Sequence, residues 1–485
     1  ATRPPPLARG PSAPRPERPA AMGSQQSVVD SDGRGDLDLS GAARSFDERW
    51  RDQLLPTDLS SLSRRLGFKT LGVKALFDQY PESRQTFFAE TLPHVVGLAG
   101  QLPQLLPGLR LKRLVQGARD RLFLPRSLVA SLLAHMFLCT IPEDDRSEAM
   151  PSVSFDHLLG CSSQEEVAKL CMFVHYFDRL REAPPRGELR IYRQVRDAAA
   201  SEEEQQEAWA RSRRPLLAIE AVAMNVGFED VEKGEGCLHA DFANMFIGGG
   251  VLRGGCVQEE IRFAICPELC ASLLVCPCML ANEAITVVGG EQFSAYSGYG
   301  RSLRFGGPFR HPSMPTDKDG TPLVAITAMD ALDFRGADAS IEKQMSLPFE
   351  LRELEKAAAA FEPVDEAALR TWPTIATGNW GCGVFLGCAP LKAVLQWLAA
   401  SEGGRQLRYF PFDLTLGPEL AALSKELSAA GVTVGELFKA LRSLSYGRGG
   451  PPRGPDVLRA LRAAAAKRGP EAEGRKSKLK SQARA

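Results

Sequence analysis

The chain has 485 residues, 44% of them apolar, and its 59 lysines and arginines balance 59 aspartates and glutamates. This length indicates two or three domains, and the apolar fraction is that of a globular protein. The balanced charge favours no particular partner, and no apolar run reaches the roughly 18 residues that a membrane span needs. The 11 cysteines form no Cys-x-x-Cys pair, which favours reduced thiols in a cytosolic or nuclear protein.

Residues 1–44 are predicted to be a disordered N-terminal segment. The first part is rich in proline and arginine, and a stretch rich in Gly, Ser and Asp follows, so neither can bury a core. Met22-Gly23 followed by Ser27 fits an N-myristoylation pattern if Met22 starts the protein. An incidental match is the favoured interpretation.

Apolar residues recur at helical spacing between residues 45 and 214, for example over 128–137,. Prolines divide this region into several short helices. It is therefore predicted to be an all-helical accessory domain without catalytic residues. No metal site is predicted in it, because histidines such as His94, His135 and His157 are dispersed along the sequence.

Residues 215–446 alternate short apolar runs with helical patterns and are predicted to form a second domain. The predicted strands are 216–224, 237–242, 284–288, 323–328 and 408–412. The predicted helices are 258–270, 346–361 and 389–400. Such alternation is typical of an α/β fold, with a mixed, largely parallel sheet flanked by helices. Residues 447–485 are predicted to be a basic, mostly disordered tail that contains one helix, Asp456 to Arg468. Nuclear import or polyanion contact is the functional alternative for this tail.

Residues 241–260 hold the densest group of candidate functional residues. Glycine lets a backbone approach a ligand without a Cβ in the way, and a loop between a strand and a helix N-terminus can bind a diphosphate. Adjacent carboxylates on a helix diverge by about 100°, so the paired glutamates cannot face the same atom. Crowding and burial are expected to raise the proton affinity of at least one of them. The candidates are Asp241, Asn244, Gly248, Gly249, Gly250, Gln258, Glu259 and Glu260.

A second glycine-rich loop spans residues 377–385 and precedes a helix that Pro390 can start,. Its backbone amides and the helix N-terminus are predicted to hold a diphosphate. The candidates are Thr377, Gly378, Asn379, Trp380, Gly381, Cys382, Gly383 and Phe385.

Together these two loops resemble the signature of the poly(ADP-ribose) glycohydrolases. The resemblance continues through Ile261-Arg262-Phe263 and Gly298-Tyr299, has a fainter counterpart over 131–140, and covers about residues 90 to 440. It implies an elaborated macrodomain at 215–446, on which a helical accessory domain packs.

The resemblance also implies an activity, the hydrolysis of ribose–ribose O-glycosidic bonds in poly(ADP-ribose) with release of ADP-ribose. Glu260 would be the general acid/base and Glu259 would bind ribose hydroxyls. Asp241 and Asn244 would fix the geometry. This differs from the usual glycosidase arrangement of two well-separated carboxylates.

Two aromatic residues join the expected substrate-binding set by the same resemblance. Tyr299 would cover the substrate as a lid, and Phe412 would lie at the adenosine end. Two positions depart from the family pattern, since Cys388 replaces a capping carboxylate and Met245 replaces a residue that is usually basic. The adenine-contacting acid stays open among three candidates: Glu229, Asp230 and Glu232.

The alternative hypothesis is a non-catalytic macrodomain that binds ADP-ribose or poly(ADP-ribose). The presence of both Glu259 and Glu260 disfavours it. No cofactor and no metal are predicted. The expected partners are poly(ADP-ribose) and ADP-ribosylated proteins, with no direct DNA or RNA contact, no membrane span and a monomeric chain. The expected location is the nucleus and/or cytoplasm, with a role in the DNA damage response.

Overall fold

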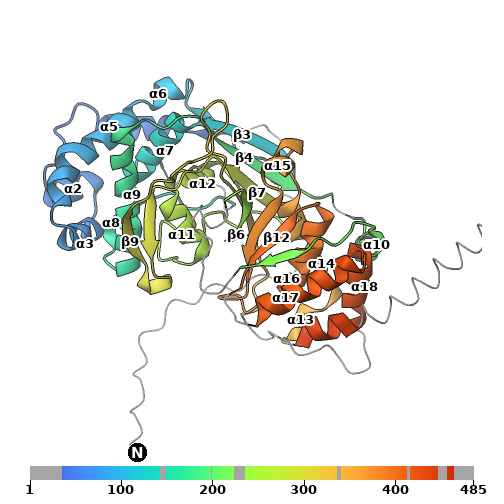
Figure 1. Cartoon of the computed structure of the whole chain (residues 1–485). Helices are drawn as coiled ribbons and strands as arrows, with labels where there is room; N and C mark the ends of the chain where they lie inside the picture. The colour runs from blue at the N-terminus through green and yellow to red at the C-terminus, as the bar shows by residue number, and fades with distance from the viewer. Residues whose placement is uncertain are drawn as a thin grey trace, which may run out of the picture. The chain divides into compact units, whose positions relative to one another are not determined.

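The largest sheet has eight strands in the order β3-β4-β7-β10-β6-β11-β12-β5 (Figure 1). The computed structural model describes residues 35–142, 149–197, 199–222, 235–335, 340–411, 415–445 and 456–463. Four of the seven strand pairings are parallel and join β10, β6, β11, β12 and β5. The other three, which join β3, β4, β7 and β10, are antiparallel. The strands are β3 (Asp120–Pro125), β4 (Glu188–Val195), β5 (Ile219–Ala221), β6 (Cys237–Ala243), β7 (Glu283–Val288), β10 (Ala325–Asp330), β11 (Thr374–Gly378) and β12 (Gln406–Phe410).

All five predicted strands of the second domain are present, with shifted ends. The central strands β7 and β10 are buried at every position, which is why they stand out in the sequence as continuous apolar runs. β12 ends at Phe410, and Phe412 lies outside the described residues. β11 was not predicted. This strand is only five residues long and its last residues belong to the second glycine-rich loop, so its sequence resembles a loop.

In the N-terminal region, the helices from α1 to α6 come before β3 in the sequence, and α7, α8 and α9 come after it. They are α1 (Ser40–Arg49), α2 (Leu59–Leu66), α3 (Leu71–Gln79), α4 (Ser83–Thr86), η1 (Phe87–Thr91), α5 (Leu92–Gly100), α6 (Leu102–Leu105), α7 (Arg126–Phe137), α8 (Asp156–Gly160) and α9 (Gln164–Glu182). A small antiparallel pair joins β1 (Leu37–Asp38) to β2 (Arg110–Leu111).

Of the later helices, α10 precedes β5, and the others follow strands of the second domain, as the alternation predicted. They are α10 (Glu202–Arg211), α11 (Gln258–Ile265), η3 (Pro267–Ala271), α12 (Ser272–Val275), η4 (Gly300–Ser302), α13 (Ile341–Gln344), α14 (Leu347–Phe361), α15 (Glu366–Thr371), α16 (Ala389–Glu402), α17 (Leu416–Ala429) and α18 (Val434–Ser445). A second small antiparallel pair joins β8 (Ser294–Ser297) to β9 (Arg304–Pro308). No helix in the described ranges is both long and apolar enough to cross a bilayer.

The region 45–214 is mainly helical, but it is not all-helical as predicted. Its strands β3 and β4 extend the large sheet, and β4 pairs with β7 from Arg190 to Val195. β4 alternates buried and partly exposed residues over most of its length. The sequence does not show this alternation clearly, because a buried position is occupied by Arg193. Sheet pairing therefore links the two predicted domains.

Both predicted disordered ends also contain ordered structure. Within 1–44, residues 37–44 form β1 and the start of α1, and Leu39 is fully buried. Within the predicted tail 447–485, Leu458 and Leu461 are buried in the core beside α17 and α18. In both cases a few apolar residues at helical or strand spacing are enough to attach a mostly polar segment.

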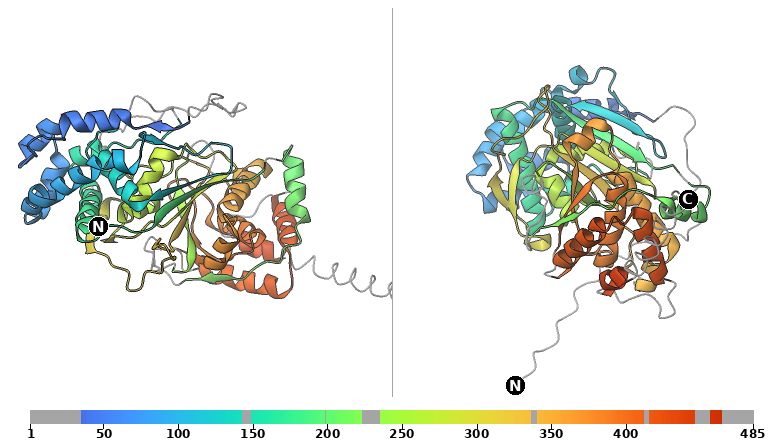
Figure 2. Two further views of the ribbon diagram at one scale, coloured as in Figure 1. Left: turned by 90° about the horizontal axis from the view of Figure 1, so that it is seen from above. Right: turned by 45° about the vertical axis from the view of Figure 1, so that its right-hand side comes forward.

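Two hydrophobic cores cover opposite faces of the sheet. The first contains side chains of α7, α9 and α11 packed on β7 and β10, and the second contains side chains of α14, α16, α17 and α18 packed on β6, β11 and β12. Figure 2 shows the two groups of helices with the strands between them. In β6, Leu238 and Ala240 belong to the second core and Ala243 to the first. Alternation along the strand therefore turns Asp241 toward the α11 side.

Candidate active site

The candidate site lies where the loops after β6 and β11 leave the sheet. These strands are parallel neighbours, so their carboxyl ends lie at one edge. The chain continues from β6 into α11, in the first core, and from β11 into α16, in the second core. Such a change of face opens a crevice at the carboxyl ends of the strands, where α/β proteins bind ligands.

Asp241 is the most buried carboxylate of the site, with 1% of its surface exposed. Neither carboxylate oxygen has a hydrogen-bond partner among the described residues. Burial raises the pKa of Asp241 to about 8; the Arg262 guanidinium opposes this rise and the Glu260 carboxylate adds to it. Burial therefore favours the neutral form of the Asp241 carboxyl.

Glu259 is held by the backbone of the first glycine-rich loop. Its Oε1 accepts a hydrogen bond of 2.6 Å from the Gly248 N–H, and its Oε2 accepts one of 2.8 Å from the Asn244 N–H. Burial, followed by the Asp241 and Glu260 carboxylates, raises the pKa of Glu259 well above its usual range, although these two N–H groups favour the charged form. The expectation that crowding raises proton affinity in this group is confirmed.

Glu260 reaches both the loop and the start of its own helix. Its Oε1 accepts a 2.9 Å hydrogen bond from the Gly250 N–H, and its Oε2 accepts a 2.8 Å bond from the Val257 N–H. By accepting the Val257 N–H at the start of α11, Glu260 acts as the glutamate of a capping box does,. Of the three carboxylates, Glu260 is the most exposed, at 7%.

The glycines around these carboxylates leave room for their oxygens. A Cβ added at Gly249 would lie 2.6 Å from both Glu259 Oε2 and Glu260 Oε1, and one added at Gly255 would lie 2.5 Å from Glu260 Oε1. Gly249 also has a φ of 50°, which side-chain-bearing residues rarely adopt. The loop therefore needs glycine because the carboxylates occupy the space that a side chain would fill.

Lys169 connects the N-terminal helices to this loop. Its buried ammonium, on α9, donates hydrogen bonds to the backbone carbonyls of Gly250, Arg253 and Gly255, at 3.4, 2.5 and 2.5 Å. Burial lowers the pKa of Lys169, and the Cys256 and Glu260 side chains oppose that effect. The same loop thus gives its N–H groups to the glutamates and its carbonyls to Lys169.

Gln258 and Tyr299 border the start of α11. The Gln258 side chain accepts a 2.8 Å hydrogen bond from the Phe242 N–H and donates one of 3.2 Å to the Ala240 carbonyl, which fixes α11 to β6. The Gln258 N–H donates to the Tyr299 hydroxyl at 3.0 Å. Tyr299 is 48% exposed, so its ring is accessible beside the helix N-terminus.

The second glycine-rich loop is anchored by α16. Gln396 accepts a 2.5 Å hydrogen bond from the Thr377 hydroxyl and donates one of 3.1 Å to the Gly378 carbonyl. The loop closes on itself where the Gly387 N–H donates to the Gly381 carbonyl at 2.9 Å. These contacts hold the backbone of the loop in front of the N-terminus of α16.

Side chains of the second loop mostly point into the protein. The Trp380 ring is fully buried and donates a 2.9 Å hydrogen bond to the Met329 carbonyl, with Lys392 Nζ 4.0 Å from the ring centroid. Asn379 accepts a 2.9 Å hydrogen bond from the Tyr409 hydroxyl. These predicted substrate-binding side chains therefore support the loop.

Three further positions complete the second loop. Burial raises the pKa of the Cys382 thiol, which donates to the Trp380 carbonyl. The Phe385 ring lies 5.2 Å from the Arg335 guanidinium, measured to the ring centroid. Cys388 is the N-cap residue of α16 and makes no side-chain cap hydrogen bond, so the sequence departure noted there leaves this helix end without a capping carboxylate.

The predicted site residues thus gather in two neighbouring loops. Contacts join the residues of the first loop to one another, and the second loop follows the adjacent strand. Phe412 and the three candidates for the adenine-contacting acid lie outside the described residues. Sequence reasoning missed Lys169 entirely. It also missed Gly255, for which the Gly254-Gly255 pair before the glutamates was an available signal.

Known proteins match this chain over both regions. A family profile described as poly(ADP-ribose) glycohydrolase, macro domain fold, matches residues 206–416, and one described as the helical domain of that glycohydrolase matches 79–193. Poly(ADP-ribose) glycohydrolase 1 of Arabidopsis thaliana is 30% identical, over 82% of this chain and 86% of that protein. Poly(ADP-ribose) glycohydrolase 1 of Caenorhabditis elegans is 32% identical, over 73% of this chain and 44% of that protein. A crystal structure of poly(ADP-ribose) glycohydrolase from Deinococcus radiodurans in complex with ADP-ribose is 17% identical, with a TM-score of 0.27, over 49% of this chain and 94% of that chain.

Proposed function

Because the chain belongs to the poly(ADP-ribose) glycohydrolase family, we propose that it hydrolyses the ribose–ribose O-glycosidic bonds of poly(ADP-ribose) and releases ADP-ribose. Its fold is the macro domain with an N-terminal helical domain. The observation that carries the proposal is the group of three buried carboxylates formed by Asp241, Glu259 and Glu260. A glycine-rich loop holds the two glutamates of this group. A loop that served only to bind a ligand would not need to bury three acidic groups together, which is costly.

Glu260 is proposed as the general acid/base. In the first step its carboxyl group gives a proton to the leaving ribose oxygen while the anomeric C–O bond breaks. In the second step its carboxylate takes a proton from water, whose oxygen bonds to the anomeric carbon. Glu260 suits this role because it is the most exposed of the three carboxylates and both of its oxygens are positioned by backbone N–H groups.

Glu259 and Asp241 are proposed to prepare the site for this chemistry. The loop N–H groups orient the Glu259 carboxylate. In this orientation Glu259 would accept hydrogen bonds from the ribose hydroxyls. Burial raises the pKa of Asp241. The neutral form that it favours would place no negative charge beside Glu260 and would provide an O–H donor. The expected result is a site that tolerates the approach of an anionic substrate.

The N-terminus of α16 is proposed to hold the substrate diphosphate. The positive end of a helix dipole attracts phosphate oxygens, and backbone N–H groups of the glycine-rich loop in front of it would donate to them. Since Cys388 supplies no carboxylate there, no side-chain charge at the cap competes with the phosphates. The diphosphate would in turn stabilise positive charge that develops on the ribose as the bond breaks. Tyr299 would cover the substrate, and no cofactor or metal ion takes part.

The proposal extends to partners and location. Poly(ADP-ribose) and ADP-ribosylated proteins are the proposed partners, without direct contact to DNA or RNA, and the chain would act as a monomer. The nucleus and/or cytoplasm, and a role in the DNA damage response, are proposed on the family relationship alone.

The test is a time course of the chain acting on an automodified poly(ADP-ribose) polymerase, with ADP-ribose and oligomers separated. Steady release of ADP-ribose is expected. The same assay would show whether cleavage starts at chain ends or internally, and whether the protein-linked unit remains. Tight ADP-ribose binding without any product would instead support the non-catalytic binding module.

A further inference from the structure

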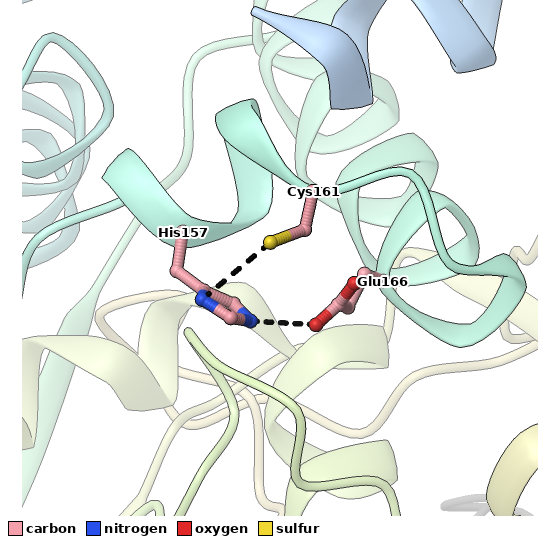
Figure 3. A group of neighbouring side chains, drawn as sticks. All are labelled: His157, Cys161 and Glu166. Atoms are coloured by element: carbon pink, nitrogen blue, oxygen red, sulfur yellow. Dashed lines mark hydrogen bonds and ion pairs between the residues drawn. The ribbon is translucent and has the colours of Figure 1, made fainter. Parts of the chain in front are cut away.

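We propose that His157, Cys161 and Glu166 form a binding site for one transition-metal dication, with Zn²⁺ as the ion of best fit. One donor atom from each of the three residues lies within 4.8 Å of the other two. Figure 3 shows the Cys161 thiol and the Glu166 carboxylate both directed at the His157 ring. The dispersed histidines of this region did not indicate the group, because its other two members are a cysteine and a glutamate.

Local helix geometry brings the three side chains together. His157 lies in α8 and Cys161 is the C-cap residue of that helix, four positions later, so both side chains project from one face,. Glu166 lies in the first turn of α9. A loop of three residues separates the two helices, from Cys161 to Ser163, which keeps the third side chain close to the first two.

The distance between the Cys161 and His157 donors suits a tetrahedral ion,. Cys161 Sγ lies 3.6 Å from His157 Nδ1, and a thiolate and an imidazole nitrogen bound to one zinc ion are separated by about 3.5 Å. Glu166 Oε1 lies 2.6 Å from His157 Nε2. Cys161 and Glu166 thus contact different nitrogens of the His157 ring. An ion bound by Nδ1 and Cys161 Sγ would gain its third ligand when the Glu166 carboxylate leaves Nε2 and swings to the Nδ1 side of the ring. The His157 side chain is 33% exposed, so water can reach the fourth position.

The donor set and the local charge both favour a metal dication. Thiolate, imidazole and carboxylate together are typical of zinc and related d-block ions, and Mg²⁺ or Ca²⁺ would prefer oxygen donors alone. The Glu166 and Asp156 carboxylates both act on Cys161, so the group carries negative charge that a dication would offset. Metal binding displaces the proton of a cysteine ligand. The Lys169 ammonium acts on Glu166 from the same helix, but it is already bonded to three loop carbonyls.

The proposed metal site adjoins the first glycine-rich loop. A Cβ built at Gly254 would lie 3.8 Å from Glu166 Oε1. Glu166 also lies one turn before Lys169 on α9. A bound ion would therefore tie the α8–α9 corner to the helix that holds this loop. Its expected effect is on stability, because none of its ligands belongs to the proposed catalytic group.

The experiment uses the full chain, stripped of metal by a chelator, passed through a desalting column and then titrated with Zn²⁺. One tightly bound ion per chain is expected by elemental analysis. Co²⁺ substitution should give a thiolate-to-cobalt charge-transfer band, which reports the Cys161 bond directly. At a Zn²⁺ concentration 100 times Kd, the thermal unfolding midpoint should rise by about 3 °C.

Variants locate the ion among the many thiols of the chain. Cys161→Ser and His157→Gln should each abolish the charge-transfer band and the rise in midpoint. The matched control Cys139→Ser, at another partly buried thiol of the same region, should keep both. Unfolding midpoints without metal establish that the variants fold. Absence of stoichiometric binding by the wild type, or unchanged binding by folded Cys161→Ser, would overturn the proposal; the readout is bound metal and does not depend on glycohydrolase activity.

Discussion

Replacing Lys169 with methionine tests whether the N-terminal helices position the catalytic loop. Methionine keeps most of the apolar side chain and removes the ammonium, which leaves the carbonyls of Arg253 and Gly255 without their Lys169 donor at 2.5 Å. We expect a decrease in kcat with little change in ADP-ribose affinity. The reason is that the loop carrying the Gly250 N–H would no longer hold Glu260 in place.

The size of the effect follows from the contacts that are lost. Hydrogen bonds to a charged group contribute about 1.5–3 kcal/mol each, and only two of the three Lys169 bonds are short. The cost of burying the ammonium offsets part of that gain. The net loss of stability is therefore about 2–4 kcal/mol. A displacement of the loop by about 1 Å would reduce kcat by about 10²-fold.

The assay measures initial rates of ADP-ribose release and, separately, ADP-ribose affinity by calorimetry. Lys74→Met is the matched control, because Lys74 is an exposed lysine on another N-terminal helix, paired only with Asp78. The control should behave as the wild type. If folded Lys169→Met retained wild-type kcat, the view that Lys169 positions the loop would be wrong.

Three further variants test separate parts of the site and fold. Gly255→Ala should fold but lose at least tenfold in kcat, since its Cβ would lie 2.5 Å from Glu260 Oε1; wild-type rates would show that the loop can shift at no cost. Asp241 has its pKa raised from 3.8 to about 8, so folding loses stability as pH rises through that window. Asp241→Asn should therefore be more stable than the wild type at pH 8, by at most about 5 kcal/mol, with no gain near pH 4 in urea unfolding, and should be less active. A chain starting at Pro215 would lack β4, which pairs with six residues of β7, and should be insoluble; soluble, active protein would show that the helical region is dispensable.

The candidate residues of the first loop could be predicted because their chemistry is local in sequence. Gly249 and Gly250 stand next to the positions that the glutamates occupy, and Gln258 to Glu260 form the first turn of one helix. Spacing alone therefore placed the glycines and carboxylates together. The pKa of Asp241 could not be predicted, because it depends on the full burial of this carboxyl in the folded chain and on the positions of the Arg262 and Glu260 charges.

Residues that act over long sequence distances were not predictable from local patterns. Lys169 is one of several charged residues in the first half of α9, and it bonds to carbonyls 81 to 86 positions later. The sequence contains no sign that this lysine, rather than an exposed neighbour, is buried. The strands β3 and β4 were missed for a similar reason, since their pairing with β7 depends on tertiary contacts,.

The role of Glu260 is best tested by comparing turnover and ligand binding in Glu260→Gln. Glutamine keeps the size of the side chain and one of the two hydrogen bonds that Glu260 accepts from the backbone, but it cannot exchange a proton with the substrate or with water. We predict a loss of at least about 10²-fold in the rate of ADP-ribose release, with ADP-ribose affinity retained through the second loop. A folded Glu260→Gln variant that cleaves poly(ADP-ribose) at the wild-type rate would contradict the assignment of Glu260 as the general acid/base.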